Sequence, residues 1–289
     1  MKISIVIPIY NEENAILKTV TNIQDVLKKI NNEYEIILIN DGSTDNTQSI
    51  LNSIIDDKIS TIQHLHNLGY GASLKNGISK AKYDWILITD ADGTYPIDQI
   101  PDLINNAENC DMVVGARTGS LVKDTLFRMI GRNIVRKFAS YVSKADIKDI
   151  NSGFRIFKKD TAKQFWHLYP DGFSFTSTIT VACFTTKKEV KYVPINYFKR
   201  TGKSSIKPAK DFIGFISLIT RLAIYFNPLR VFVPLFILFF TMSWVILAYG
   251  YFFKGVILDV TWSILLTTSL QIIIFGFLAD MIVKRFYQK

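Results

Sequence analysis

Residues 85–95 read Trp-Ile-Leu-Ile-Thr-Asp-Ala-Asp-Gly-Thr-Tyr, and this stretch decides how the fold is interpreted. Its first five residues are apolar or β-branched and predict a buried parallel strand. The strand delivers two carboxylates, Asp90 and Asp92, onto the loop that follows it. Carboxylates one residue apart can converge on one hard divalent cation, which keeps open positions for phosphate oxygens. The alternative is an acidic turn in which Asp92-Gly93 makes the bend between a strand and a helix.

The first part of the chain alternates between strand-like and helix-like segments. Three further β-branched or apolar runs predict strands at residues 2–8, 34–40 and 59–65. Helix-period apolar residues or N-cap candidates after each strand predict a helix in every connection. Four strand and helix pairs with short connections predict an α/β fold, namely an open, mostly parallel, Rossmann-like sheet with flanking helices.

In open α/β sheets, ligands bind where the parallel strands end. Polar residues follow all four predicted strands, and we expect them to face one shared crevice: Pro8 to Glu12, Asp41, Asn67 to Gly71, and Asp90 to Asp92. This shared location favours a functional site over a simple turn at the acidic pair.

Further elements are predicted after the acidic pair. They are a helix at 97–107, strands at 112–115, 156–157 and 191–197, and a basic helix at 127–137. Arg128, Arg132 and Arg136 are four residues apart and therefore share one face of the basic helix, which is either a binding stripe or a solvated surface. Residues 199–205 form a basic loop that could close over a phosphate.

The end of the chain is strongly apolar. Hydrophobic residues make up 48% of the sequence, and the mean hydropathy of +0.19 reflects two uncharged runs, 231–253 and 260–279. At about 1.5 Å per residue, each run would cross the roughly 30 Å of a bilayer's hydrocarbon core as a helix. We therefore predict two transmembrane helices, at about 229–253 and 260–283, joined by a short turn.

The net charge of +9 is concentrated on both sides of these two runs rather than spread along the chain. Basic residues flanking a pair of spans predict that the domain before the spans and both termini are cytoplasmic, and they argue against nucleic acid as a partner. We expect an integral protein of a bacterial or archaeal plasma membrane, with no signal peptide because the N-terminus runs directly into a strand. The two cysteines have no metal-ligand spacing, and a cytoplasmic location makes a disulfide unfavourable.

Residues 208–226 precede the first span and have two faces. As a helix, they place Lys210, Gly214, Ser217 and Arg221 on one narrow face, with apolar residues around the remainder. This pattern predicts an amphipathic helix in the membrane interface. The alternative is a helix packed on the globular domain. The predicted organisation is a catalytic domain at 1–206, a juxtamembrane helix at 207–228 and two spans within 229–289.

Seven motifs occur in order along the chain. They are Ile-Val-Ile-Pro-Ile-Tyr-Asn-Glu (5–12), Ile-Asn-Asp-Gly-Ser-Thr-Asp (39–45), Asn-Leu-Gly-Tyr-Gly (67–71), Thr-Asp-Ala-Asp-Gly (89–93), Gly-Ala-Arg (115–117), Asn-Ser-Gly-Phe-Arg (151–155) and Arg-Thr-Gly-Lys-Ser-Ser (200–205). Together they resemble the family 2 glycosyltransferases, which have a GT-A fold. The resemblance is to the polyprenyl-phosphate group, which contains dolichol-phosphate mannose synthase and the bactoprenol glucosyltransferases.

The resemblance implies roles for particular residues. The positions that match the nucleotide-sugar site of the family are Pro8, Tyr10, Glu12, Ile39, Asp41, Asp90, Ala91, Asp92, Arg200 and Lys203. Within this set, Asp90 and Asp92 match the site of the Mg²⁺ or Mn²⁺ cofactor, and Asp92 matches the direct ligand. Arg117, Arg128 and Arg132 match the region that receives the lipid phosphate. The implied partners are a nucleotide sugar, a polyprenyl phosphate and membrane lipid, and a homo-oligomer is left open.

Two positions depart from the family pattern. A second metal ligand is often Gln two residues after the acidic pair, where this chain has Thr94. Ser205 stands where the basic loop usually has Lys, so that Lys203 or Lys207 would have to substitute. The resemblance therefore leaves open how the cation and the donor phosphate are fully held.

The expected reaction is the inverting transfer of a hexose from a UDP- or GDP-sugar to a polyprenyl phosphate. A phosphate monoester has a second pKa near 6, so at pH 7 it is mostly dianionic and needs no catalytic base. Consistent with this, the stretch 174–178, Ser-Phe-Thr-Ser-Thr, contains no carboxylate. One alternative is a membrane polysaccharide glycosyltransferase with a hydroxyl acceptor; its Gln-x-x-Arg-Trp motif is not supplied by residues 164–167. A non-catalytic membrane scaffold is the other alternative.

Overall fold

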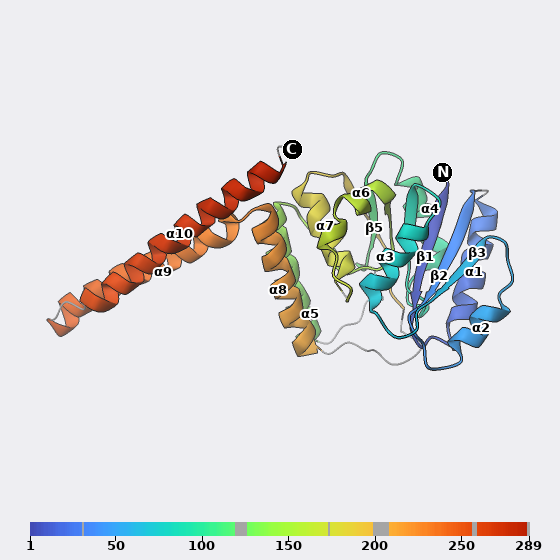
Figure 1. Cartoon of the computed structure of the whole chain (residues 1–289), viewed down its shortest axis with the longest axis horizontal. Helices are drawn as coiled ribbons and strands as arrows, with labels where there is room; N and C mark the ends of the chain where they lie inside the picture. The colour runs from blue at the N-terminus through green and yellow to red at the C-terminus, as the bar shows by residue number, and fades with distance from the viewer. Residues whose placement is uncertain (31, 119–125, 173, 199–207, 256–258, 288–289) are drawn as a thin grey trace. The chain divides into compact units, whose positions relative to one another are not determined.

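The computed structural model describes residues 1–30, 32–118, 126–172, 174–198, 208–255 and 259–287, without the side chains of 126–132, 208–213, 215, 254, 286 and 287. The chain divides into two units, Met1–Phe215 and Ile216–Lys289. Figure 1 labels most of their helices and strands, and each unit is considered by itself.

The first unit is built on a seven-stranded sheet with the order β3-β2-β1-β4-β6-β5-β7. All neighbouring strands are parallel except for the two pairs that β6 makes with β4 and β5. The strands are β1 (Ile3–Ile9), β2 (Tyr34–Asn40), β3 (Ile59–Gln63), β4 (Trp85–Ile88), β5 (Met112–Ala116), β6 (Arg155–Lys158) and β7 (Val190–Pro194). The predicted open, mostly parallel α/β sheet is confirmed.

Helices cover both faces of this sheet, which explains why the central strands are apolar without alternation. One face of β1, carrying Ile3, Ile5 and Ile7, packs in a buried cluster with residues of α1 (Ile16–Lys29), η1 (Ile97–Gln99) and α4 (Ile100–Asn105). The other face is covered by α3 (Tyr70–Lys80), and the Phe157 ring of β6 lies 6.4 Å from the Phe175 ring of α7 (Phe175–Thr185). The remaining helices of this unit include α2 (Thr47–Ser53), α5 (Leu126–Ser143), α6 (Lys159–Gln164) and η2 (Trp166–Leu168).

The strand order places the predicted site at a change of chain direction. β1 pairs with β2 on one side and with β4 on the other, and Ile3 is opposite both Tyr34 and Trp85. The chain therefore leaves all three strands at the same edge of the sheet. Open α/β sheets bind ligands at the carboxyl ends of their parallel strands, next to the point where the strand order reverses.

Several predicted boundaries are wrong. The third strand ends at Gln63, the last one ends at Pro194 rather than 197, and the helix predicted at 97–107 is a 3₁₀ turn followed by α4. Helices α6 and α7 were not predicted. The sequence of α7, Phe-Thr-Ser-Thr-Ile-Thr-Val-Ala-Cys-Phe-Thr, is β-branched and hydroxyl-rich, which is typical of a strand. The buried Thr178 and Thr180 hydroxyls nevertheless have acceptors, because they donate to the carbonyls of Ser174 and Thr176, four residues earlier.

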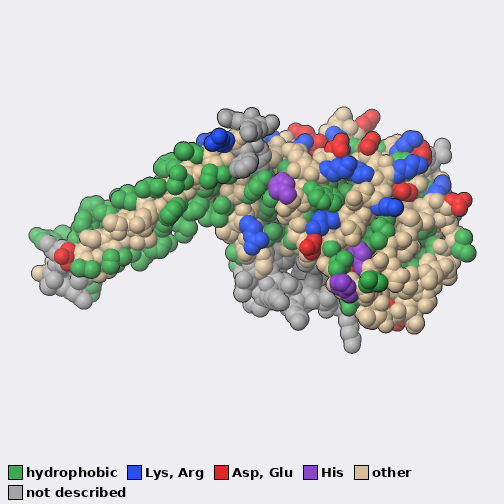
Figure 2. Space-filling model, viewed as in Figure 1, with side chains coloured by type: hydrophobic (Ala, Val, Ile, Leu, Met, Phe, Trp, Pro, Cys, Tyr) green, Lys and Arg blue, Asp and Glu red, His purple; other side chains and the backbone are tan. Residues whose placement is uncertain are grey.

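The second unit contains two long antiparallel helices that pack on each other, α9 (Leu229–Tyr249) and α10 (Asp259–Tyr287), with a π-helical turn at Gly250–Lys254. Close packing is visible where a Cβ on Gly276 would lie 2.7 Å from the Cβ of Phe232. The hydropathy of Leu229–Phe253 is 2.4 and that of Asp259–Arg285 is 1.8, yet only 6% and 11% of their most apolar windows are buried. Core helices of a soluble protein would bury these side chains, whereas Figure 2 shows them covering the visible face of the hairpin. The structure thus confirms two helices that are long and apolar enough to span a membrane.

Helix α8 (Pro208–Phe226) precedes the hairpin. Its described side chains have two faces, because Ser217 and Arg221 are exposed while Ile219 and Phe226 are buried. The two-faced character is as predicted, and the location of this helix in a membrane interface stays a prediction.

Gly77 permits α3 to lie directly on the sheet. A Cβ at this position would clash with Val6 of β1 and lie 2.9 Å from Cδ1 of Ile39 on β2. Gly77→Ala should therefore destabilise the first unit by about 1–3 kcal/mol through overpacking. Thermal unfolding of the detergent-purified protein measures the effect. Gly214→Ala is the control, because no atom of the described residues lies within 4 Å of that Cβ and alanine favours the helix. An unchanged melting temperature for Gly77→Ala would contradict the close contact.

Candidate active site

Asp41 follows β2 and is held by three hydrogen bonds. Its carboxylate accepts the backbone N–H groups of Leu68 and Gly69, each at 2.9 Å, and His64 Nδ1 lies 2.7 Å from Oδ1. Nδ2 of Asn76 can only donate to Nε2 of His64, at 2.8 Å, so Nδ1 of His64 donates to Asp41. Three of about four carboxylate acceptor positions are thus used within the protein.

The glycine-rich turn at 67–71, which we expected to face the shared crevice, uses several of its N–H groups for contacts within the chain. The N–H groups of Leu68 and Gly69 bind Asp41, and those of Gly71 and Ala72 donate to the carbonyls of Gly172 and Asp171 at 2.9 Å. The turn therefore fixes Asp41 and the start of α3, because its donors have partners within the chain.

The other residues predicted to bind the donor lie at the end of β1 and in β2. Pro8 is half-buried near the end of β1, and the Tyr10 side chain beyond it is exposed. The backbone N–H of Glu12, a buried residue, donates to the Thr47 hydroxyl at 3.0 Å, which joins this loop to the start of α2. Ile39 is fully buried, with its side chain packed near Gly77, so this side chain belongs to the core. The structure gathers these positions at the carboxyl edge of β1 and β2.

The acidic pair follows β4, and both carboxylates are oriented by hydroxyl groups. The Tyr70 hydroxyl donates to Oδ1 of Asp90 at 3.1 Å, and burial raises the pKa of Tyr70, which keeps it protonated. Oδ1 of Asp92 accepts the Thr94 hydroxyl at 2.6 Å and the Thr94 N–H at 3.1 Å. Between them, Ala91 is buried and its carbonyl accepts the Thr19 hydroxyl at 3.0 Å.

The bend predicted by the turn alternative is also present. Gly93 has φ +71°, a left-handed conformation that favours glycine. Asp92 is nevertheless buried, with only 6% of the residue exposed. Solvated turn aspartates are not held in this way, because burying a carboxylate is costly unless it has a partner. The loop is therefore a turn that also positions a carboxylate.

The chemistry of this donor set fits a hard divalent cation. Asp90 and Asp92 supply carboxylate oxygens, the ligand type that Mg²⁺ and Mn²⁺ prefer. Among the described residues there is no group of three or more His, Cys, Asp or Glu side chains that could hold a metal ion. A cation at this pair would therefore take its other ligands from water or from phosphate oxygens of a bound nucleotide.

Arg117, directly after β5, forms a bidentate ion pair with Asp149. Its Nε donates to Oδ2 at 2.8 Å and its Nη2 to Oδ1 at 2.9 Å, and the side chains are 15% and 8% exposed. Burial alone would raise the pKa of the Asp149 carboxyl, but the charge and hydrogen bonds of Arg117 lower it to about 2. The same pairing outweighs burial at Arg117 and raises its pKa well above the usual value. Both groups are thus fully charged at neutral pH.

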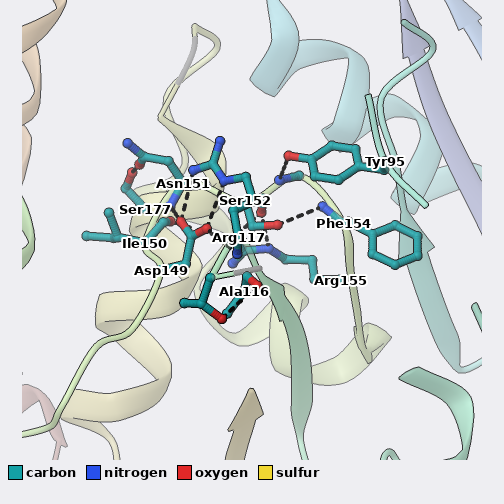
Figure 3. Close-up of polar contacts among 12 residues, drawn as sticks. Tyr95, Ala116, Arg117, Asp149, Ile150, Asn151, Ser152, Phe154, Arg155 and Ser177 are labelled. Carbon is teal, nitrogen blue, oxygen red and sulfur yellow. Dashed lines mark hydrogen bonds and ion pairs between the residues drawn. The ribbon is translucent and has the colours of Figure 1, made fainter. Parts of the chain in front are cut away.

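Two tyrosines connect this ion pair to the acidic pair. The guanidinium of Arg117 lies over the Tyr197 ring, 5.3 Å from its centroid, and the Tyr197 ring meets the Tyr95 ring edge-on at 5.4 Å. The Tyr95 hydroxyl accepts the N–H of Gly153 at 2.7 Å, as Figure 3 shows. A Cβ at Gly153 would lie 2.8 Å from Oδ1 of Asp90, so the backbone at this point directly adjoins the acidic pair.

Four of the predicted site residues cannot be placed. Arg128 and Arg132 belong to α5, of which only the backbone is described at these positions, and Arg200 and Lys203 lie outside the described residues. The sequence interpretation missed five residues of the site, namely Tyr70, Thr94, Tyr95, Asp149 and Tyr197. Their proximity to recognised motifs is the signal that could have indicated them. The contact of Thr94 with Asp92 is local, whereas the roles of the other four depend on contacts between distant segments.

The fold and this site define an α/β protein with a polar site at the carboxyl ends of its parallel strands, and comparisons with known proteins identify the family. The model of glycosyl transferase family 2 matches residues 4–166, and the model of the GtrB C-terminal hairpin matches residues 227–284. The first match covers more than half of the chain. This chain belongs to glycosyl transferase family 2, and the predicted resemblance is confirmed.

Two curated relatives carry names that concern lipid-linked sugars. The undecaprenyl-phosphate 4-deoxy-4-formamido-L-arabinose transferase of Proteus mirabilis is 29% identical over 161 residues, which cover 55% of this chain and 49% of that protein. The dolichyl-phosphate beta-glucosyltransferase of Dictyostelium discoideum is 28% identical over 240 residues, which cover 73% of this chain and 72% of that protein. The chain spans about half the length of the first curated relatives it matches.

Solved structures show the same fold at lower identity. The glucosyl-3-phosphoglycerate synthase of Mycobacterium tuberculosis, in complex with Mn²⁺, UDP and phosphoglyceric acid, superposes with a TM-score of 0.59. It is 15% identical, and the match covers 77% of this chain and 78% of that one. At this identity the comparison supports the GT-A-like fold alone.

The hydrogen bond between Thr94 and Asp92 can be tested directly. Thr94→Val keeps the shape of the side chain but removes the hydroxyl that donates to Asp92 at 2.6 Å. Because hydrogen bonds to charged groups contribute about 1.5–3 kcal/mol, we expect sugar transfer to fall by about 10- to 100-fold. Initial rates of transfer measure the loss. Thr94→Ser should retain most of the activity, and equal rates for the valine and serine variants would contradict this role.

Proposed function

We propose that this chain transfers a hexose from a nucleotide sugar to a polyprenyl phosphate at a membrane surface, with inversion at the sugar carbon. One observation carries the proposal. Arg117 lies over the Tyr197 ring, and Tyr197 in turn contacts Tyr95. The Tyr95 hydroxyl binds the backbone of Gly153, which adjoins Asp90, so a continuous series of contacts links the cation to the acidic pair. A donor diphosphate and an acceptor phosphate thus have separate, oppositely charged places within one site.

The donor would occupy the carboxyl edge of β1, β2 and β4. Pro8, Tyr10 and Glu12 lie where β1 ends, and the fixed carboxylate of Asp41 lies where β2 ends. Asp90 and Asp92 would hold Mg²⁺ or Mn²⁺, which would offset the charge that develops on the departing nucleoside diphosphate. Arg200 and Lys203 are proposed as additional cationic contacts to the donor phosphates. This chain's own contribution is orientation, because the hydroxyls of Tyr70 and Thr94 fix the two carboxylates.

The acceptor side is suited to a phosphate rather than to a hydroxyl group. A phosphate monoester is already an anionic nucleophile at neutral pH, so it needs no general base. The guanidinium of Arg117 would bring it to the sugar by charge-assisted hydrogen bonds, with Arg128 and Arg132 of α5 as further cationic groups. Single in-line attack at the sugar carbon would then invert its configuration.

The membrane part of the proposal is supported by the apolar hairpin of α9 and α10 and by the two relatives whose names include a polyprenyl phosphate. Basic residues at the outer ends of the hairpin favour a cytoplasmic location for the catalytic domain and both termini. The lipid acceptor would then be presented from the cytoplasmic leaflet of the membrane. Association into a homo-oligomer is compatible with this arrangement.

Asp92→Ala should abolish transfer while leaving folding and membrane insertion intact, because it removes the proposed metal ligand. Purified protein is incubated with labelled nucleotide sugars and polyprenyl phosphate, and the product is extracted as lipid. The exposed Asp98→Ala is the control and should retain wild-type activity. Full activity of Asp92→Ala would refute the metal site, and a wild-type protein that labels no lipid with any UDP- or GDP-sugar would refute the proposed function.

The membrane topology can be tested with introduced cysteines. The native Cys110 and Cys183 are buried, and burial raises the pKa of Cys183 to about 12, so both should be silent towards thiol reagents. A membrane-impermeant maleimide added to intact cells should label Phe253→Cys, at the hairpin tip, but not Lys284→Cys. Labelling of Lys284→Cys should require permeabilised cells. The opposite pattern would place the catalytic domain outside.

A further inference from the structure

The segment Asp149–Gly153 joins the acceptor side of the site to the donor side. At one end, the Asp149 carboxylate holds the side chain of Arg117 and also accepts its backbone N–H at 3.1 Å. At the other end, Gly153 adjoins Asp90 so closely that a Cβ would lie 2.8 Å from its Oδ1. Only three residues lie between Asp149, which binds Arg117, and Gly153, which adjoins Asp90. This short backbone segment therefore limits how far Arg117 and Asp90 can move relative to each other.

Arg155 fastens this segment to the fold. Its guanidinium is fully buried, and it donates to the carbonyls of Ile150 and Ser152 within the segment. It also donates to the carbonyl of Thr176 at 3.1 Å and to the hydroxyl of Thr180 at 2.8 Å, both in α7. Figure 3 shows the guanidinium beneath the segment. Because one rigid group satisfies carbonyls from both sides, the segment is tied to α7 and cannot shift without leaving buried donors unpaired.

The Asn151 side chain adds a second attachment to the same helix. The Ser177 hydroxyl of α7 donates to Oδ1 of Asn151 at 2.6 Å, and the N–H of Asn151 donates to Oδ1 of Asp149 at 3.1 Å. The Asp149 carboxylate is therefore held in place by a residue of its own segment, independently of its contact with Arg117. A fixed carboxylate determines the plane of the guanidinium that it binds, because a bidentate pair is planar.

The pairing leaves part of Arg117 available. A guanidinium has five N–H donors, and Asp149 binds the edge formed by Nε and Nη2. Within the described residues no hydrogen bond is found for Nη1 of Arg117. The edge formed by Nη1 and Nη2 can therefore bind two oxygens of a phosphate, with Nη2 using its second N–H, while Asp149 holds the adjoining edge formed by Nε and Nη2. Tyr197 beneath the guanidinium restricts its tilt.

We propose that Asp149 is a positioning residue for the acceptor phosphate, acting only through Arg117, and that the segment Asp149–Gly153 sets the distance between Arg117 and Asp90. The inference rests on the proposed function, since it assigns the acceptor phosphate to Arg117. Asp149 does not contact the substrate. It directs the free edge of the Arg117 guanidinium toward the sugar and keeps this cation from folding onto the acidic pair.

The test is Asp149→Asn, which preserves the side-chain shape but presents an amide N–H₂ or a neutral oxygen to the guanidinium. We expect the KM for polyprenyl phosphate to rise by about 10- to 100-fold, the range seen when a group that orients a binding residue is lost. The KM for the nucleotide sugar should stay within about twofold of the wild-type value, because the donor contacts are unchanged. Asp146→Asn, an exposed aspartate three residues earlier, is the control and should behave as the wild type.

A double-mutant cycle separates positioning from a general structural role. In an Arg117→Ala background, Asp149→Asn should have no additional effect on the KM for the lipid, because the residue through which it acts is absent. Additive losses would overturn the proposal, as would a wild-type KM for the lipid in Asp149→Asn alone. If Asp149→Asn is not recovered as folded protein, Arg117→Lys replaces it. Lysine can keep one contact to Asp149 but offers no second edge, so its KM for the lipid should rise similarly, and a wild-type value would overturn the proposal.

The outcomes also distinguish this inference from the proposed function. If the wild-type protein transfers no sugar to polyprenyl phosphate, the proposed function fails, and the inference fails with it. If the wild type is active and Asp149→Asn changes only the KM for the nucleotide sugar, the proposed function stands and the positioning role of Asp149 is refuted.

Discussion

The parallel pairing of β1 with β2 and β4 is the constraint on which the site depends. Because Ile3 is opposite both Tyr34 and Trp85, the chain leaves the three strands at one edge of the sheet. Residues far apart in sequence are thereby brought together by backbone hydrogen bonds alone. Helices on both faces bury the strands, so that edge is where polar groups at strand ends can meet a ligand. Side-chain hydrogen bonds then refine positions that the sheet has already set.

Much of this arrangement could be predicted from the sequence, because it depends on local pattern. The β-branched runs identify β1 to β4, the acidic pair follows directly from a strand end, and the uncharged runs identify α9 and α10. The elements that were missed depend on tertiary contacts. Helix α7 has the composition of a strand, and its buried hydroxyls are satisfied by carbonyls one helical turn earlier, which no local sequence pattern indicates. Likewise, Asp149 is ordinary in sequence and gains its role only by meeting Arg117, across 32 residues of chain.

Buried charge is confined to places where the protein supplies partners. Arg117 and Asp149 neutralise each other, and Arg155 is satisfied by carbonyl and hydroxyl oxygens. Burial lowers the pKa of Arg155, yet its usual value is so high that it stays charged at neutral pH. A buried cation of this kind is weak evidence for stability but strong evidence for a fixed geometry, since every donor must keep its acceptor. The position of Arg117 is therefore fixed largely by the buried contacts of Arg155, which lie outside the proposed acceptor site.

The hydrogen bonds and ion pairs of four described carboxylates favour a phosphate over a hydroxyl group as the acceptor substrate. Asp41 accepts three hydrogen bonds, Asp149 is paired with Arg117, and the hydroxyls of Thr94 and Tyr70 bind Asp92 and Asp90. A carboxylate whose pKa is lowered to about 2, as in Asp149, is a poor proton acceptor at neutral pH. Each of these four acids would have to leave a partner in order to act as the base for a hydroxyl nucleophile. A phosphate nucleophile needs no base, only a cation held in a fixed position, as Arg117 is.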